Sequence, residues 1–131
     1  MVTCDYLLIC NFTWVDEHRH ACLIGIYDGL AAAHPPIDLP RMGISSAIHS
    51  TPGARHQLAL VVLDSGGIPL NGWSGEVICG ALGASSASVN LGPTRFVQAG
   101  RHAVVLMVDD QEIQRAPLTI TFAGIPGSQR H

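Results

Sequence analysis

Histidine is the residue type in this chain best suited to chemistry, and seven are present. His18 and His20 are separated by one residue, and such a pair shares a side of the chain only in a β-strand. They spell the H-x-H of small metal-binding double-stranded β-helix enzymes, but no glutamate follows in residues 21–27. Residues 16–20, DEHRH, are typical of a polar turn, and no third ligand has a fixed spacing to them. We therefore predict solvated turn histidines and no metal or cofactor site. Four other histidines fall at the ends of separate predicted elements: His34, His49, His56 and His102.

Candidate nucleophiles are equally isolated. The nearest approach to a G-x-S-x-G elbow is G-W-S-G-E around Ser74, where Glu76 takes the place of the second glycine. Cys79 is flanked by apolar residues, without the positive charge that lowers a thiol pKa. Gly66 and Gly67 precede a strand instead of the helix that a phosphate cradle needs. The sequence predicts no catalytic residue and no enzyme.

Two further residue pairs have a structural and a functional interpretation. Asp109 and Asp110 are adjacent and form a candidate carboxylate pair. However, Asp tolerates a positive φ and suits a tight hairpin turn. Trp14 and Trp73 could anchor an interface or stack on a sugar, or could close the end of the core. Their burial decides between these alternatives.

These residues need strands to position them, and the clearest pair of strands lies at 101–122. Apolar residues occupy both faces of the first strand, which indicates a central place in a sheet. The second strand is expected at 118–122, because Pro117 lacks the N–H that a ladder requires. Leu118, Ile120 and Phe122 should then face inward.

Other segments predict strands by their alternation and by Gly and Pro at their ends. They cover residues 5–15, 21–27, 42–49, 55–64, 73–84 and 88–96, the last with a break at Gly92 and Pro93. Residues 51–53, Thr-Pro-Gly, favour a type II turn. Residues 29–34 could form one short helical turn before Pro35 and Pro36.

Together these patterns predict an all-β fold, an antiparallel β-sandwich of seven to eight strands with an Ig-like general architecture. A partly closed barrel is the alternative. The length of 131 residues predicts a single domain at 1–123, followed by a flexible tail at 124–131.

Composition limits the partners. Hydrophobic residues make up 47% of the chain and charged residues 13%, against a typical charged share of about 25%. A surface so poor in charge favours a homo-oligomer or a protein partner. The net charge of −3 and seven scattered basic residues, all arginine, argue against nucleic acid.

Compartment and redox state follow from simple patterns. No apolar run reaches the roughly 18 residues of a membrane span. The start of the chain lacks the features of a secretory signal, so we expect a cytoplasmic protein. Four cysteines without C-x-x-C spacing, Cys4, Cys10, Cys22 and Cys79, are expected to be reduced and structural.

A resemblance to a known family rests on three stretches. They are LLICNFTWVDEHRHACLIGIYDGLAAAHPP at 7–36, FVQAGRH at 96–102 and VDDQEIQRAPLTI at 108–120. Val15 with Asp16, residues 25–28 and Gly100 match the family pattern, whereas Asn11, His102 and Asp110 depart from it at turn and packing positions. The chain resembles the bacterial family of small all-β proteins of unknown function numbered 6941. The resemblance implies architecture and no mechanism.

The sequence therefore favours a non-enzymatic interaction or scaffolding module. The alternatives are a small-molecule or carbohydrate-binding sandwich and, third, a metal-dependent enzyme that uses its histidines. We expect self-association through residues 42–49, predicted as an edge strand that lacks lysine. Ser46→Pro should then separate the copies.

Overall fold

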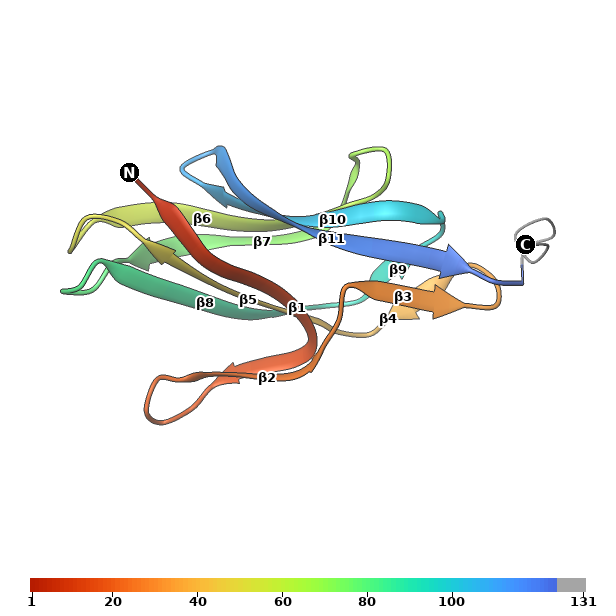
Figure 1. The fold of residues 1–131 in the computed structure, drawn as a ribbon, viewed down its shortest axis with the longest axis horizontal. Coiled ribbons are helices and arrows are strands. Elements are labelled where there is room, and N and C mark those ends of the chain that lie inside the picture. Colours follow the sequence, from red (N-terminus) through yellow and green to blue (C-terminus); the bar gives the residue numbers. More distant parts are fainter. Residues whose placement is uncertain (125–131) are drawn as a thin grey trace.

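The computed structural model describes residues 1–124 of the chain, and these residues form an all-β sandwich (Figure 1). The strands are β1 (Thr3–Val15), β2 (Ala21–Ile26), β3 (Gly29–Ala32), β4 (Ile37–Leu39), β5 (Met42–His49), β6 (Arg55–Leu63), β7 (Pro69–Ile78), β8 (Ala84–Leu91), β9 (Thr94–Phe96), β10 (Gly100–Val108) and β11 (Gln111–Phe122). The predicted strands are all present, and the short strands β3 and β4 are additional to them.

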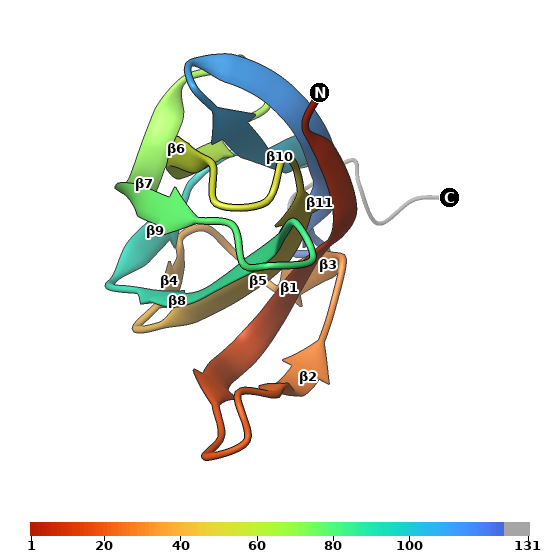
Figure 2. The ribbon, with the colours of Figure 1, turned by 90° about the vertical axis from the view of Figure 1, so that its left-hand side faces the viewer.

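The strands form two facing layers, which Figure 2 shows along the length of the strands. One sheet has the order β2-β1-β5-β8, and the other has the order β3-β11-β10-β6-β7. β4 and β9 form a separate two-stranded ribbon. All strand pairs are antiparallel except β3 with β11.

The β10–β11 hairpin supplies the centre of the second sheet, as predicted. β10 lies between β11 and β6, and Val104, Leu106 and Val105 are at most 2% exposed. Its turn is Asp109–Asp110, and both residues have positive φ, 50° and 66°. Positive φ at both central residues is the geometry of a type I′ turn, whose twist matches the twist of paired strands.

A single hydrophobic core fills the space between the layers. Full burial of one such aliphatic or aromatic side chain contributes about 1.5–3 kcal/mol relative to exposure. The core is made of Leu7, Ile9, Met42, Ile44, Ile48, Leu58, Leu60, Val62, Cys79, Ala87, Leu91, Phe96, Val104, Leu106, Val108, Leu118, Ile120 and Phe122.

The predicted helical turn at 29–34 is wrong. Gly29–Ala32 is strand β3, which pairs in parallel with β11 from Thr119 to Phe122, and no helix is present among residues 1–124. The segment between the break at Asp28 and Gly29 and the two prolines could close one helical turn, but local preference is a weak prior that tertiary context overrides. Here Leu30 and Ala32 pack against the core, and β3 completes the edge of the sheet beside β11.

The predicted edge strand is also wrong, because β5 is central. It pairs with β1 on one side and β8 on the other, and its residues 42–46 are all buried. The lower apolar content of residues 42–49 favours an edge position. Instead, Ser45 is satisfied inside the sheet, with its hydroxyl 3.0 Å from that of Ser88. Ser46→Pro would break a central ladder, so it cannot test for an interface.

β11 begins earlier than predicted, at Gln111, and continues through Pro117. A proline is tolerated there because β3 covers β11 only from Thr119 onward, which leaves the outer edge at Pro117 without a neighbouring strand. The inward positions are confirmed, since Leu118, Ile120 and Phe122 are buried.

The turn predicted at residues 51–53 and the break predicted at Gly92 and Pro93 are confirmed, whereas one strand begins earlier in the chain than predicted. Gly53 has φ of 78° and the N–H of Ala54 donates to the carbonyl of Thr51, as in a type II turn. The segment at 88–96 is broken between β8 and β9, at Gly92 and Pro93. The strand expected at 73–84 is β7, which runs from Pro69 to Ile78.

The tail expected at 124–131 lies outside the described residues, apart from Gly124. No helix in the part of the chain that the structure describes is long or apolar enough to cross a membrane.

Candidate functional site

The hairpin of β1 and β2 extends beyond the body of the sandwich, and Figures 1 and 2 show this from two sides. β1 pairs with β5 only from Thr3 to Cys10, whereas it pairs with β2 from Cys10 to Val15. The outer half of β1 therefore has a strand neighbour on one side only. This part of the chain is free to present side chains to another molecule.

Asn90 on β8 fixes the direction of the hairpin. Its Oδ1 accepts a hydrogen bond from the N–H of Thr13 at 3.0 Å, and its Nδ2 donates to the carbonyl of Thr13 at 2.8 Å. This reach across β5 depends on Gly43, where an added Cβ would lie 2.7 Å from the Sγ of Cys10 and 3.2 Å from Asn90 Oδ1. The Asn90 side chain thus bonds both backbone groups of Thr13, as a neighbouring strand would, and holds the hairpin to the sheet.

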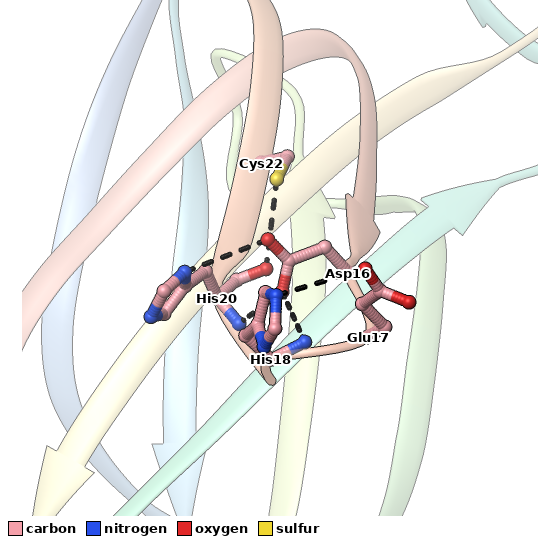
Figure 3. A network of polar contacts seen from close by, with 5 residues as sticks. All are labelled: Asp16, Glu17, His18, His20 and Cys22. Carbon is pink, nitrogen blue, oxygen red and sulfur yellow. Dashed lines mark hydrogen bonds and ion pairs between the residues drawn. The ribbon is translucent and has the colours of Figure 1, made fainter.

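Asp16 organises the tip of the hairpin, which Figure 3 shows in detail. Its Oδ1 accepts hydrogen bonds from the N–H groups of His18 and His20, at 2.9 and 2.8 Å. The bond from the backbone of His20 is the main cause that lowers the pKa of the Asp16 carboxyl. Arg19 has φ of 63°, so the chain reverses within this polar loop. The predicted turn is confirmed.

One side of this hairpin carries an apolar surface, here called the hairpin face. Strand pairing places Phe12 beside Ile24, Trp14 beside Cys22 and Cys10 beside Ile26, so these positions share one side. The hairpin face consists of Phe12, Trp14, Cys22, Ile24 and Ile26. Trp14 is 40% exposed, Ile24 56% and Ile26 61%, which are high values for side chains of this size. Exposed apolar residues that gather on one face mark an interaction site.

Aromatic contacts hold the shape of the hairpin face. The rings of Phe12 and Trp14 stack with their centroids 5.9 Å apart, and the guanidinium of Arg41 lies 4.6 Å from the centre of the Phe12 ring. A cation over an aromatic face contributes about 0.5–1 kcal/mol at an exposed site. Trp14 is thereby presented in an ordered position.

β2 is also an open edge of its sheet, because β1 is its only strand neighbour within residues 1–124. Its sequence, ACLIGI, contains neither lysine nor proline nor any charge. These are the devices by which natural edge strands resist pairing. The backbone of β2 is therefore available to another strand.

A hollow of about 440 Å³ lies at the base of the hairpin. It is lined by Leu7, Leu8, Ile9, Ile26, Tyr27, Asp28, Ala116 and Pro117. Its volume falls within the range of ligand pockets, about 300–1,000 Å³. Burial raises the pKa of the Tyr27 phenol to about 12, and its buried hydroxyl has no hydrogen-bond partner among the described residues. Its lining is mainly apolar, and Tyr27 and Asp28 are the polar side chains in it.

The histidines do not converge. His18 and His20 lie at the hairpin tip with ring centroids 6.0 Å apart, and His49 contacts Asp5 at 2.5 Å. His102 is buried against Phe96, and His34 is exposed in the loop before β4. Within residues 1–124, no group of three His, Cys, Asp or Glu side chains is placed to hold a metal ion.

The other residues singled out by sequence also lie apart. Ser74 is exposed in the middle of β7, whereas Cys79 is 1% exposed and belongs to the core. Burial raises the pKa of the thiols of Cys4 and Cys10, which makes them poor nucleophiles. Trp73 is half-buried against the core, so Trp14 is the more exposed tryptophan.

One polar cluster was missed by the sequence analysis. Ser50, His56 and Asp109 come from three different segments, and the hydroxyl of Ser50 lies 2.8 Å from His56 Nε2. His56 Nδ1 in turn lies 2.6 Å from Asp109 Oδ2. Asp109 was interpreted only as a turn residue. No spacing in the sequence signals this cluster, since six residues separate the first pair and 53 the second.

A family model matches residues 5–121 of the chain, which is most of its length. The chain belongs to DUF6941, a family of unknown function. The resemblance stated from the sequence is thus confirmed. No curated protein matches the chain at a significant level.

Solved structures resemble this chain at low sequence identity. The DNA glycosylase AlkC of Pseudomonas fluorescens, bound to DNA that contains an abasic-site analogue, is 14% identical, with a TM-score of 0.55 over 92% of this chain. A glycosyl hydrolase family 2 member from Bacteroides cellulosilyticus is 12% identical, with a TM-score of 0.49 over 91% of this chain. The chain corresponds to only 30% of the first structure and 15% of the second. The likeness to AlkC shows the fold alone.

Proposed function

We propose that this domain is a protein-interaction module that self-associates through the hairpin face and the open edge of β2. The observation that carries the proposal is the exposure of Ile24 and Ile26, 56% and 61%, on an edge strand without charge. A sandwich with 13% charged residues has little else to keep such an edge from pairing.

A second copy fits this edge because the edge is complementary to itself. Antiparallel pairing about a two-fold axis keeps the same side of each strand facing the same way. Centred on Ile24, such pairing would place Cys22 of one copy beside Ile26 of the other. The two hairpin faces would then form one continuous apolar surface.

Ile24→Glu tests this arrangement. Light scattering coupled to size exclusion, at tens of micromolar protein, should give a dimer for the wild type and a monomer for the variant. A carboxylate in the middle of the interface loses an apolar contact and adds a charge that is costly to bury. We expect roughly 3 kcal/mol or more per interface, which corresponds to a dissociation constant at least about 100-fold weaker.

Ile78→Glu is the matched control. Ile78 is 54% exposed, nearly the same as Ile24, and it ends β7, an edge strand of the other sheet. This variant should remain dimeric. A monomeric wild type, or dissociation by Ile78→Glu but not by Ile24→Glu, would overturn the proposed interface.

A further inference from the structure

The cluster of Ser50, His56 and Asp109 lies at the end of the sandwich away from the hairpin face. Ser50 directly follows β5, whose last residue, His49, pairs with the first residue of β1. The hairpin face belongs to the opposite end of β1. The two surfaces can therefore be tested separately.

The three side chains form a continuous hydrogen-bond chain. Ser50 Oγ lies 2.8 Å from His56 Nε2, and His56 Nδ1 lies 2.6 Å from Asp109 Oδ2. The hydrogen bond from His56 is the main cause that lowers the pKa of Asp109, so this carboxyl is ionised at neutral pH. An ionised carboxylate can only accept, which puts the imidazole proton on Nδ1. Nε2 is then left to accept the proton of the Ser50 hydroxyl.

The backbone holds each member in place. Asp109 Oδ1 accepts the N–H of Gln57 at 2.9 Å, and the N–H of Asp109 donates to the carbonyl of Gln57 at 2.8 Å. The N–H of Ser50 donates to the carbonyl of Gly83 at 2.8 Å. The turn after Ser50 brings the chain back into β6, so that His56 faces it. The His56 side chain is only 13% exposed, which limits its freedom to rotate.

We propose that Ser50 is an activated nucleophile that accepts acyl groups from small carboxylic esters. His56 is the adjacent base that activates Ser50, and Asp109 is the third group that orients the base, as in known nucleophilic triads. This activity goes beyond the proposed self-association and does not depend on it.

The chemistry requires no group beyond these residues, the ester and water. Ser50 Oγ attacks the carbonyl carbon while His56 Nε2 takes the hydroxyl proton, and a C–O bond to the serine forms. The tetrahedral intermediate collapses, the bond to the alkoxy group breaks, and His56 returns its proton to the departing alcohol. Water then attacks the acyl-serine with the same help from His56, which releases the carboxylic acid and restores the hydroxyl.

The surroundings limit the substrate. In the turn, Thr51 uses its carbonyl as an acceptor, and its N–H donates no hydrogen bond among the described residues. This N–H follows the nucleophile directly, and in the proposal it is the one donor assigned to a developing oxyanion. Loss of one such donor from a pair lowers turnover by about 100- to 1,000-fold, so a site that relies on one donor should be slow. Esters with good leaving groups, such as nitrophenyl acetate, are therefore the substrate class that we expect the Ser50 site to hydrolyse.

Two probes test the proposal with the wild-type protein. A fluorophosphonate should modify Ser50, located by peptide mass spectrometry, and p-nitrophenyl acetate should be hydrolysed with release of nitrophenol. Both reactions should disappear in denaturing urea, because the activation depends on folded geometry. Absence of label on Ser50 in the folded protein, or equal labelling after unfolding, would overturn the proposal.

Variants separate activation from simple exposure. Ser50→Ala should abolish both reactions, and His56→Gln should slow them by about 100-fold or more, as loss of a general base does. His49→Gln is the matched control, because His49 also contacts an aspartate but has no serine on its ring among residues 1–124. Unchanged labelling of Ser50 in a folded His56→Gln protein would show that the hydrogen-bond chain activates nothing.

Discussion

Ser45 and Ser46 offer a sharp test of the packing, because they are neighbours on the central strand β5 and both are 0% exposed. They point to opposite faces of the sheet. The hydroxyl of Ser45 lies 3.0 Å from that of Ser88 and 3.4 Å from that of Tyr6. The buried hydroxyl of Ser46 has no hydrogen-bond partner among the described residues. Alanine at the two positions should therefore have opposite effects on stability.

The magnitudes follow from the cost of an unpaired polar group. An unsatisfied buried hydroxyl costs about 1–3 kcal/mol, so Ser46→Ala should raise the free energy of unfolding by about 1 kcal/mol after the small lost volume is counted. Ser45→Ala removes hydrogen bonds that contribute about 0.5–1.5 kcal/mol and leaves Ser88 without this partner. The two variants should differ by about 2 kcal/mol.

Urea denaturation followed by tryptophan fluorescence measures this difference. With a slope of about 1–3 kcal/mol per molar urea, the midpoints of the two variants should lie about 1 M apart, on either side of the wild type. A midpoint for Ser46→Ala below that of the wild type, or equal midpoints for the two variants, would refute the packing of β5 described above.

Two further predictions concern the hairpin base and acid stability. Gly43→Ala should lower the free energy of unfolding by about 1–3 kcal/mol in urea, because the added Cβ would lie 2.7 Å from Cys10 Sγ. The pKa of Asp109 is lowered in the folded state, mainly by the bond from His56, so the unfolded chain binds its proton first as the pH falls. The stabilisation is therefore present above the unfolded pKa of about 3.9 and is lost as the pH falls through the folded pKa. In Asp109→Asn, the free energy of unfolding should depend less on pH below about pH 4.

Each of these predictions has a matched control. Gly92→Ala should leave stability unchanged, since an added Cβ there meets nothing within 4 Å. Asp110→Asn removes a charge from the next position of the same turn and controls for net charge. Equal loss in the two glycine variants, or equal flattening in the two asparagine variants, would contradict the stated causes.

Local patterns predicted the strands and most of the turns. Alternation along β6 and β10 was enough to identify both strands, because a strand turns successive side chains to opposite faces. Asp109 and Asp110 were predicted at a hairpin turn because few residue types accept positive φ. The fold class followed from the same local signals, whereas the family followed from the resemblance, which the family model over residues 5–121 confirms.

The neighbours of each strand could not be predicted in this way. Strand pairing depends on contacts between residues far apart in the chain, such as Ile44 on β5 with Ile9 on β1 and Val89 on β8. Nothing within Gly29–Ala32 signals that β11 lies beside it, so the segment before Pro35 and Pro36 was predicted as a helical turn. Residues 42–49 were predicted as an edge strand because they are less apolar, and their central place depends on partners in other strands.

The sequence by itself determined where this chain is extended and where it turns, since backbone sterics and side-chain alternation act within a few residues. The tertiary structure decided which of those strands became edges, and hence that β2 is open and β5 is covered. It also decided that Ser50, His56 and Asp109 meet. Asp109 lies 52 positions after Gln57, yet its carboxylate accepts a hydrogen bond from the N–H of Gln57. Only the closure of the sandwich, which buries a shared core, brings such distant polar groups within hydrogen-bond distance.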